Sequence, residues 1–170
     1  ALMRPKRKVL PRSSPDILKR LIPEALAIRY EGMVYDEPRL CPSCGCGVVI
    51  RHDMDGRVFC ITIVDDGFRP VKICVKRFRC KKCGHVFDGK KPFYEGCDYA
   101  SPIVDLCLSL AASNPYNRVE SILMQYGIQV DRDTVRNYAI LFRDRAMKHA
   151  GIPVMDDSRI GVNILKILFD

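Results

Sequence analysis

The sequence predicts an α+β protein with an N-terminal helix, a four-cysteine ribbon of antiparallel hairpins and a bundle of three helices. Two Cys-x-x-Cys-Gly motifs enclose a segment with β-type alternation and Asp-Gly turn signals. Apolar residues recur with a helical period before this segment and again after it. We therefore divide the chain into residues 1–37 (arm and helix), 38–98 (ribbon), 99–150 (helical bundle) and 151–170 (a linker or the start of a further domain).

Composition and charge indicate a folded, basic protein. The chain has 170 residues, of which 48% are hydrophobic and 28% are charged, enough to build a core. Its formal net charge of +8 favours an anionic partner, above all nucleic acid. The sequence has no secretory signal pattern and no apolar run of about 20 residues. We expect a cytoplasmic, nucleoid-associated protein in a reducing environment, where clustered cysteines bind metal rather than form disulfides.

The first segment combines a basic arm with a helix. The arm either contacts DNA or only adds solubility. Its basic residues include Arg4, Lys6, Arg7 and Lys8. Pro15 after Ser14 predicts the start of a helix over 15–30, and Pro23 predicts that this helix is kinked or split in two. We expect its apolar stripe to pack on the neighbouring module or on a second chain. The stripe consists of Ile17, Leu18, Leu21, Ile22, Ala25 and Leu26.

The second segment predicts three strands and two turns. The strands are expected at 48–50, 58–64 and 71–78, and the turns at 53–56 and 65–67. Each turn contains an Asp-Gly pair, a strong hairpin signal. Cys60 and Cys74 flank the second turn at nearly equal distance. We expect them to be cross-strand neighbours, or one residue out of register, and to act as small core residues.

One structural metal site is predicted by two turns of the same design, here called knuckles. They are Cys41-Pro42-Ser43-Cys44-Gly45 and Cys80-Lys81-Lys82-Cys83-Gly84. The spacing lets each turn direct two sulfurs at one point, and the glycine allows the backbone amides to face the sulfurs. Four thiolates form a closed tetrahedral site, for which we expect one zinc ion, with a rubredoxin-type iron site as the alternative. Cys46 and His85 are the competing ligands.

The third segment predicts three helices joined by short turns, a pattern typical of a helix-turn-helix. The first helix is expected to start at Ser101-Pro102. The second is expected to start at a capping-box pattern of Asn117 with Glu120 and to end at Gly127. The third is expected to start at Asp131 with Thr134. In the third helix the inward positions are Val135, Tyr138, Ala139, Phe142 and Ala146. Its outward face carries Arg136 and Asn137, with Arg132 beside its start. These residue types bond base edges in the major groove. An ordinary bundle with a solvated face is the alternative.

A second basic cluster covers the last strand and the second knuckle. It consists of Lys72, Lys76, Arg77, Arg79, Lys81 and Lys82. A metal would hold these charges on a rigid base, and we expect contact with DNA phosphates. The alternative is a strand edge that lysines protect from pairing.

The layout resembles the N-terminal region of insertion-sequence transposases over about residues 38–148. The resemblance rests on Arg77-Phe78-Arg79-Cys80-Lys81-Lys82-Cys83-Gly84-His85-Val86-Phe87 and on Tyr126-Gly127-Ile128-Gln129-Val130-Asp131-Arg132-Asp133-Thr134-Val135-Arg136-Asn137-Tyr138. It implies a zinc ribbon and a helix-turn-helix that bind double-stranded DNA at the ends of a mobile element. It also implies a parent transposase of the DDE type, whose ribonuclease-H-like domain carries three carboxylates and recombines DNA.

Such a catalytic domain is larger than the segment after residue 150, and we expect this chain to be inactive alone. Residues 162–170 are either its first strand, with Asp170 as a candidate catalytic carboxylate, or the start of a helix. The alternative function is a transcription factor that contacts promoter DNA and polymerase, and a redox iron protein is a third. The oligomeric state stays open, with a homodimer as one option.

Overall fold

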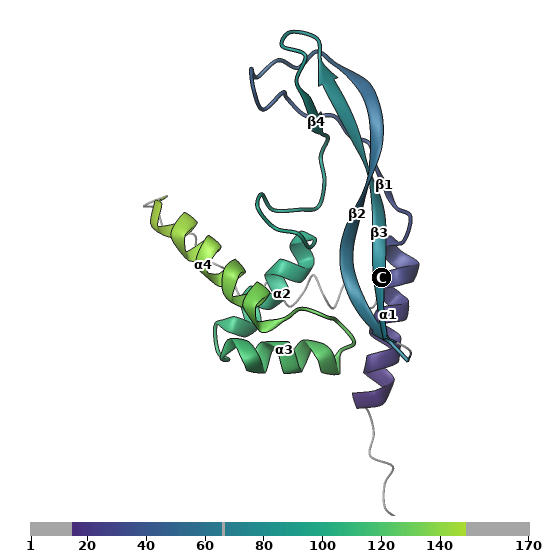
Figure 1. The fold of residues 1–170 in the computed structure, drawn as a ribbon, viewed down its shortest axis with the longest axis vertical. Coiled ribbons are helices and arrows are strands. Elements are labelled where there is room, and N and C mark those ends of the chain that lie inside the picture. Colours follow the sequence, from purple (N-terminus) through teal and green to yellow (C-terminus); the bar gives the residue numbers. More distant parts are fainter. Residues whose placement is uncertain (1–14, 66, 149–170) are drawn as a thin grey trace, which may run out of the picture.

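The computed structural model describes residues 15–65 and 67–148. The predictions for Arg4, Lys6, Arg7, Lys8 and Asp170 lie outside the described residues. The described part is an α+β fold with four helices and a mixed four-stranded sheet. In chain order the elements are α1 (Pro15–Tyr30), β1 (Val34–Tyr35), β2 (Val49–Val64), β3 (Gly67–Cys80), β4 (Val86–Asp88), α2 (Ser101–Ala111), α3 (Tyr116–Gln125) and α4 (Arg132–Lys148). A long twisted hairpin of β2 and β3 lies between α1 and the group of α2, α3 and α4 (Figure 1).

The hairpin is longer and simpler than the sequence predicts. β2 continues without interruption through 53–56, and the predicted turn there is wrong. Its pairing with β3 instead changes register between Arg51 and Met54. An irregularity of this kind bends a strand without ending it. The second predicted turn is confirmed, because β2 ends at Val64 and pairs there with Gly67, the first residue of β3.

The tight turn also sets the register around the two central cysteines. It places Cys60 opposite Val71, and a shift between Val58 and Cys60 then places Cys74 opposite Gly56. The prediction that Cys60 and Cys74 are cross-strand neighbours is therefore wrong. Cys60 is fully buried, as expected of a small core residue.

One hydrophobic core contains residues from α1, the hairpin and the helical bundle. The main contributors are Leu26 and Tyr30 of α1, Phe59, Cys60, Val71, Ile73 and Val75 of the hairpin, and Ile103, Val104, Cys107, Val119, Leu123, Val135 and Tyr138 of the bundle. Tyr30 stacks on Phe59 with ring centroids 3.9 Å apart. The hairpin is thus the platform on which both groups of helices pack, and burial of this apolar surface stabilises their arrangement.

α1 begins at Pro15 as predicted but is a single helix that continues through Pro23. Of the two predicted effects of Pro23, a kink or a division into two short helices, the division is wrong. A proline inside a helix leaves the carbonyl four residues earlier without its usual donor. Here that carbonyl belongs to Lys19, and it lies against Gly127 together with the proline ring. α1 and the end of α3 are therefore in close contact at the proline.

α3 begins differently from the prediction. It starts at Tyr116 after Pro115, and no side chain caps its first turn. Asn117 lies inside the helix, where its carbonyl accepts a hydrogen bond from the Ser121 hydroxyl. The predicted capping box is therefore wrong. The fixed φ of Pro115 provides an alternative way to start a helix.

The connection from α3 to α4 is held on the free edge of β2. Gly127 ends α3 with φ 75°, as predicted. Its carbonyl accepts a hydrogen bond from the Ile63 amide, and the Gln129 amide donates to the Ile61 carbonyl, both at 2.8 Å. Asp131 then caps α4, since its carboxylate accepts a hydrogen bond from the Thr134 amide at 2.7 Å. None of the described helices has the length and apolar character to cross a membrane.

Candidate metal centre and basic surfaces

Cys41, Cys44, Cys80 and Cys83 meet at one end of the hairpin, here called the ribbon end. Their Sγ atoms all lie within 4.8 Å of one another. The distance is 3.6 Å between the sulfurs of Cys41 and Cys83 and 3.5 Å between those of Cys44 and Cys80. Zn–S bonds of about 2.3 Å in a tetrahedron separate neighbouring sulfurs by about 3.8 Å. The four predicted ligands therefore lie close enough to hold one metal ion.

The hairpin brings the two knuckles together across 35 residues, numbers 45 to 79. β2 begins just after the first knuckle, and its first residue, Val49, pairs with Cys80 of the second. The Lys81 amide also donates to the Val48 carbonyl at 3.1 Å. An antiparallel pair returns the chain to its starting point, so the unusual length between the motifs does not disturb the site.

The glycine after each cysteine pair is required by backbone conformation. Gly45 and Gly84 have φ 69° and 75°. An added Cβ would meet nothing within 4 Å at either position. Each glycine amide closes its knuckle by donating to the carbonyl of the first cysteine, at 2.8 Å for Cys41 and 3.0 Å for Cys80. The two knuckles therefore have the same local design, as the sequence predicts.

A small apolar cluster encloses one side of the centre. Cys41 and Cys80 are each 2% exposed and pack with Phe78 and Phe87. Cys83, on the other side, is exposed. Four protein ligands leave no open coordination position, so a metal here would stabilise the fold rather than activate a substrate.

The pKa values of the cysteine thiols are compatible with a bound cation. A hydrogen bond from the Cys83 amide lowers the pKa of the Cys80 thiol to about 6, although desolvation opposes the shift. At Cys44 the Cys46 amide lowers the pKa, but desolvation and the neighbouring thiols outweigh it and raise the pKa to about 12. Adjacent sulfurs resist joint ionisation because their charges repel. A divalent cation would compensate that repulsion, since its ligands are thiolates.

The two competing ligands lie outside the cluster. Cys46 accepts a hydrogen bond at its sulfur from the Val48 amide at 3.4 Å. His85 stacks on Phe87 with ring centroids 6.0 Å apart. Within residues 15–65 and 67–148, the four knuckle cysteines form the one group of potential ligands close enough for a metal.

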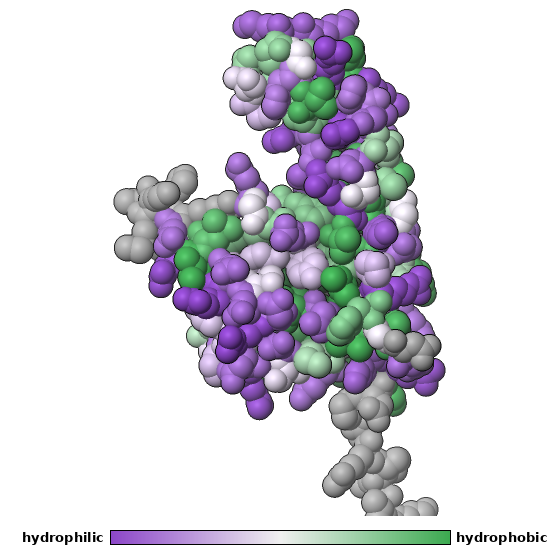
Figure 2. Space-filling model, viewed as in Figure 1, coloured by the Kyte–Doolittle hydropathy of each residue, from purple (hydrophilic) through white to green (hydrophobic). Residues whose placement is uncertain are grey.

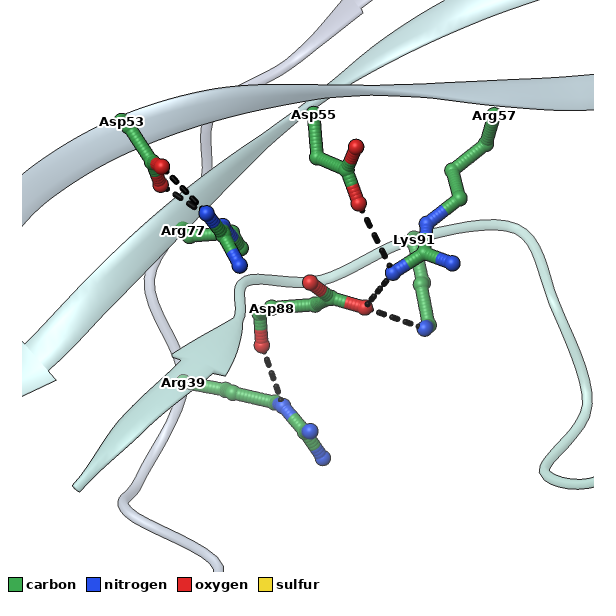
Figure 3. A network of polar contacts seen from close by, with 7 residues as sticks. All are labelled: Arg39, Asp53, Asp55, Arg57, Arg77, Asp88 and Lys91. Atoms are coloured by element: carbon green, nitrogen blue, oxygen red, sulfur yellow. Dashed lines mark hydrogen bonds and ion pairs between the residues drawn. The ribbon is translucent and has the colours of Figure 1, made fainter.

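Ion pairs and hydrogen bonds tie the strands together beside the ribbon end, in two separate groups (Figure 3). Arg77 pairs with Asp53 in one group. The other group joins Asp55, Arg57, Asp88 and Lys91, with Arg39 donating a hydrogen bond to the Asp88 carbonyl. The Asp88 side chain is only 12% exposed and binds Arg57 at 3.1 Å as well as Lys91. The Arg77 guanidinium donates two hydrogen bonds to Asp53, which lowers the pKa of that carboxyl. Arg77, predicted to contact DNA, is thus already paired with a carboxylate.

The basic cluster of the sequence divides between faces of β3. Lys72, Arg79, Lys81 and Lys82 are exposed, whereas Lys76 and Arg77 are half-buried. Alternation along a strand places Lys76 on the face opposite Arg77 and Arg79. In the view of Figure 2, hydrophilic residues line the outermost edge of the ribbon end. The cations best placed for a large anionic partner are therefore the exposed ones at the second knuckle.

α4 presents the two faces that its spacing predicts. Val135 and Tyr138 are buried in the core, while Arg136 and Asn137 are exposed. Arg132, at the start of the helix, is also exposed and pairs with its neighbour Asp133. These three outward residues remain predictions as DNA contacts.

Comparisons of the chain with protein-family models, with curated proteins and with solved structures gave no match. Its function is therefore inferred from its own residues and their arrangement.

Proposed function

We propose that this chain is the zinc-dependent DNA-binding region of a transposase, which recognises the ends of a mobile element. One observation carries the proposal. Exposed cationic side chains lie beside the four-cysteine cluster and on the packed helix α4. The motif resemblance at residues 77–87 and 126–138 supports the same function.

Zinc is the metal that this donor set favours. Zinc accepts four thiolates in a tetrahedron, and it has no redox chemistry to maintain. Its role would be to hold the second knuckle, and with it Lys81 and Lys82, against the end of the hairpin. Because the knuckle backbone would be fixed in this way, its lysines would contact phosphates with little further loss of backbone freedom.

α4 is the element proposed to read sequence. Arg136 and Asn137 share its exposed face near its N-terminal end, the part of a recognition helix that meets base edges. Arginine and asparagine form paired hydrogen bonds with guanine and adenine. The α3–α4 connection is bonded to β2, which would fix this helix relative to the ribbon end. The basic arm, with Arg4, Lys6, Arg7 and Lys8, would add phosphate contacts.

A transcription factor is the second candidate function. It is favoured by the acidic residues on the exposed side of α4, since the side chains of Asp133 and Asp144 are 72% and 56% exposed. Carboxylates repel DNA phosphates but suit a basic protein surface. In that case α4 would contact a protein of the transcription machinery.

The two candidates are separated by the DNA that the protein selects. The zinc-loaded chain is incubated with random duplexes, and the enriched site is located in the DNA around its own gene. The proposal expects a site at inverted repeats that flank the gene, bound about 10³-fold or more above scrambled duplex. Cys83→Ser is expected to abolish this preference, while Cys60→Ser, a core cysteine outside the cluster, keeps it. Enrichment of promoter sites, or no enrichment, would contradict a transposase.

A further inference from the structure

α1 carries apolar residues on two opposite faces. Pro23, Leu26 and Tyr30 form its buried face, on the side of the hairpin. Ile17, Leu21 and Ile28 are 58%, 53% and 87% exposed. At about 100° per residue, these three positions fall within about 40° of one another and nearly opposite the buried face. The stripe predicted for this helix is thus buried at Leu26 but exposed toward its N-terminal end.

This outer stripe has the form of a helix-pairing surface. Single exposed apolar residues are common on soluble proteins and need no explanation. Residues 17, 21 and 28, however, are spaced by four and seven, which aligns them along one seam of a helix. Leu18, at 39% exposure, widens the seam. α1 forms an outer flank of the molecule, so a second helix has access to it (Figure 1).

The charged residues beside the seam are complementary between two copies of the helix. Arg20 and Glu24 lie on one flank of the stripe, and neither takes part in an ion pair within the described part of the chain. In an antiparallel pair of identical helices, each flank of one helix lies beside the same flank of the other. The numbers of two residues that face each other then always add up to the same value. A centre between residues 22 and 23 would bring Ile17 opposite Ile28 of the second copy. The same register brings Arg20 opposite Ala25 and so within one residue of Glu24 of the second copy, close enough for the two long side chains to pair, twice by symmetry.

We propose that α1 pairs antiparallel with α1 of a second copy of this chain and forms a two-fold dimer. A two-fold axis requires one surface to be its own complement, and the seam meets this condition where Ile17 faces Ile28 and where Arg20 lies near Glu24. A single helix pair buries less area than a standard interface of about 1,600 Å². The dimer is therefore expected to dissociate on the order of micromolar concentration. This inference does not depend on the proposed function.

Sedimentation velocity of the full zinc-loaded chain over a range of concentrations tests the dimer. The wild type is expected to change from monomer to dimer as its concentration rises. Leu21→Glu is expected to raise the dissociation constant about tenfold or more, because it places a charge in the apolar seam. Ile50→Glu changes another exposed apolar residue, at the ribbon end and outside α1, and is expected to dimerise like the wild type. Zinc content and far-UV circular dichroism confirm that each variant is folded.

A charge exchange tests the antiparallel register. Arg20→Glu alone and Glu24→Arg alone each place like charges across the seam and are expected to weaken the dimer. An equimolar mixture of these two variants restores two opposite-charge pairs between unlike chains and is expected to give heterodimers. Any effect of the substitutions within one helix persists in the mixture, so recovery can only come from contact between chains.

Three outcomes would overturn the proposal. The first is a wild type that stays monomeric at every concentration, as expected if residues 149–170 of the same chain cover the stripe. The second is a Leu21→Glu variant that dimerises like the wild type. The third is a mixture of the two charge variants that dimerises as weakly as each variant alone.

Discussion

Gly127, at the end of α3, lies directly against Pro23 in the middle of α1. A Cβ added to Gly127 would come within 2.6 Å of the Pro23 ring and 2.8 Å of the Lys19 carbonyl. The glycine also has φ 75°, where residues with a side chain are strained. One position therefore meets two requirements, the left-handed end of a helix and the close approach of two helices.

Gly127→Ala is expected to lower the free energy of unfolding by about 2–4 kcal/mol, the sum of backbone strain and overpacking. Gly32→Ala is the matched control. Gly32 has φ 74°, but an added Cβ there meets nothing within 4 Å. Its substitution carries strain alone and should cost about 1–2 kcal/mol. Urea unfolding of both variants measures the difference. Equal losses would mean that the contact with Pro23 relaxes at no cost.

The sequence predicted the helix boundaries on either side of this connection but not the contact between Gly127 and Pro23. A glycine after an apolar helical pattern indicates a helix end, and Asp131 with Thr134 indicates the start of the next helix. Both signals act within a few residues and were confirmed. The contact with Pro23 joins positions about 100 apart in the chain, and no local pattern contains it. The same limitation left open whether Pro23 kinks α1 or divides it, and the division is wrong.

The missed ion-pair network had a signal that was interpreted differently. Asp53, Asp55 and Arg57 alternate with period two, which places them on one face of a strand. The Asp-Gly pair at 55 and 56 was interpreted as a turn instead. The partners that favour the strand, Arg77 and Asp88, come from β3 and β4. The cysteine cluster, in contrast, was predicted correctly because each knuckle contains its own turn geometry and only one meeting point satisfies both pairs.

The metal centre gives the next prediction. The purified chain is expected to contain one zinc ion and to be colourless, whereas an iron–thiolate centre would be red. Cys41→Ser should lose the metal and unfold the ribbon end, because metal binding supplies much of the folding free energy of such sites. Metal analysis and circular dichroism measure both effects.

Cys60→Ser is the control for this substitution. It should keep the metal but destabilise the core by about 1–3 kcal/mol, since a buried hydroxyl without a partner is costly. A wild type that remains fully folded after complete metal removal would refute a structural role for the centre.

A half-buried carboxyl provides a test by pH. Asp105 accepts a hydrogen bond from the Tyr94 hydroxyl at 2.7 Å. Burial raises the pKa of Asp105, and the bond from Tyr94 partly opposes this shift. Tyr94→Phe should therefore raise that pKa further. An NMR titration measures the pKa, and Asp105→Asn identifies the signal. A carboxyl that titrates at or below the ordinary aspartate value of about 3.9 would contradict the burial.

The sign of the stability effect follows from the same shift. The folded pKa lies above the unfolded value, so the folded state disfavours the charged carboxylate. The cost to stability is fully present above the folded pKa, declines as the pH falls below that value, and is absent below the unfolded pKa. Asp105→Asn should remove this pH dependence, provided that the asparagine keeps the bond to Tyr94. A pH-stability profile above the range of metal release checks this expectation.

The last prediction separates sequence reading from charge on the proposed DNA surface. Arg136 and Asn137 are exposed on α4, while Lys81 and Lys82 are exposed on the second knuckle. Loss of a good base contact should cost about 1–3 kcal/mol and weaken mainly the cognate site. Loss of a phosphate contact should weaken cognate and scrambled duplexes alike. It should also make the salt dependence shallower by about one unit of slope per contact.

The comparison uses two double variants, Arg136→Ala with Asn137→Ala and Lys81→Ala with Lys82→Ala, titrated against both duplexes at several salt concentrations. Each double variant truncates two adjacent exposed side chains, so the two proteins are matched in the extent of the change. Similar behaviour of the two variants would mean that α4 contributes charge rather than sequence recognition. Unchanged binding by the α4 variant, with weaker binding only for the knuckle variant, would assign DNA contact to the ribbon end alone. In that case the exposed carboxylates of Asp133 and Asp144 would favour α4 as a protein-binding helix.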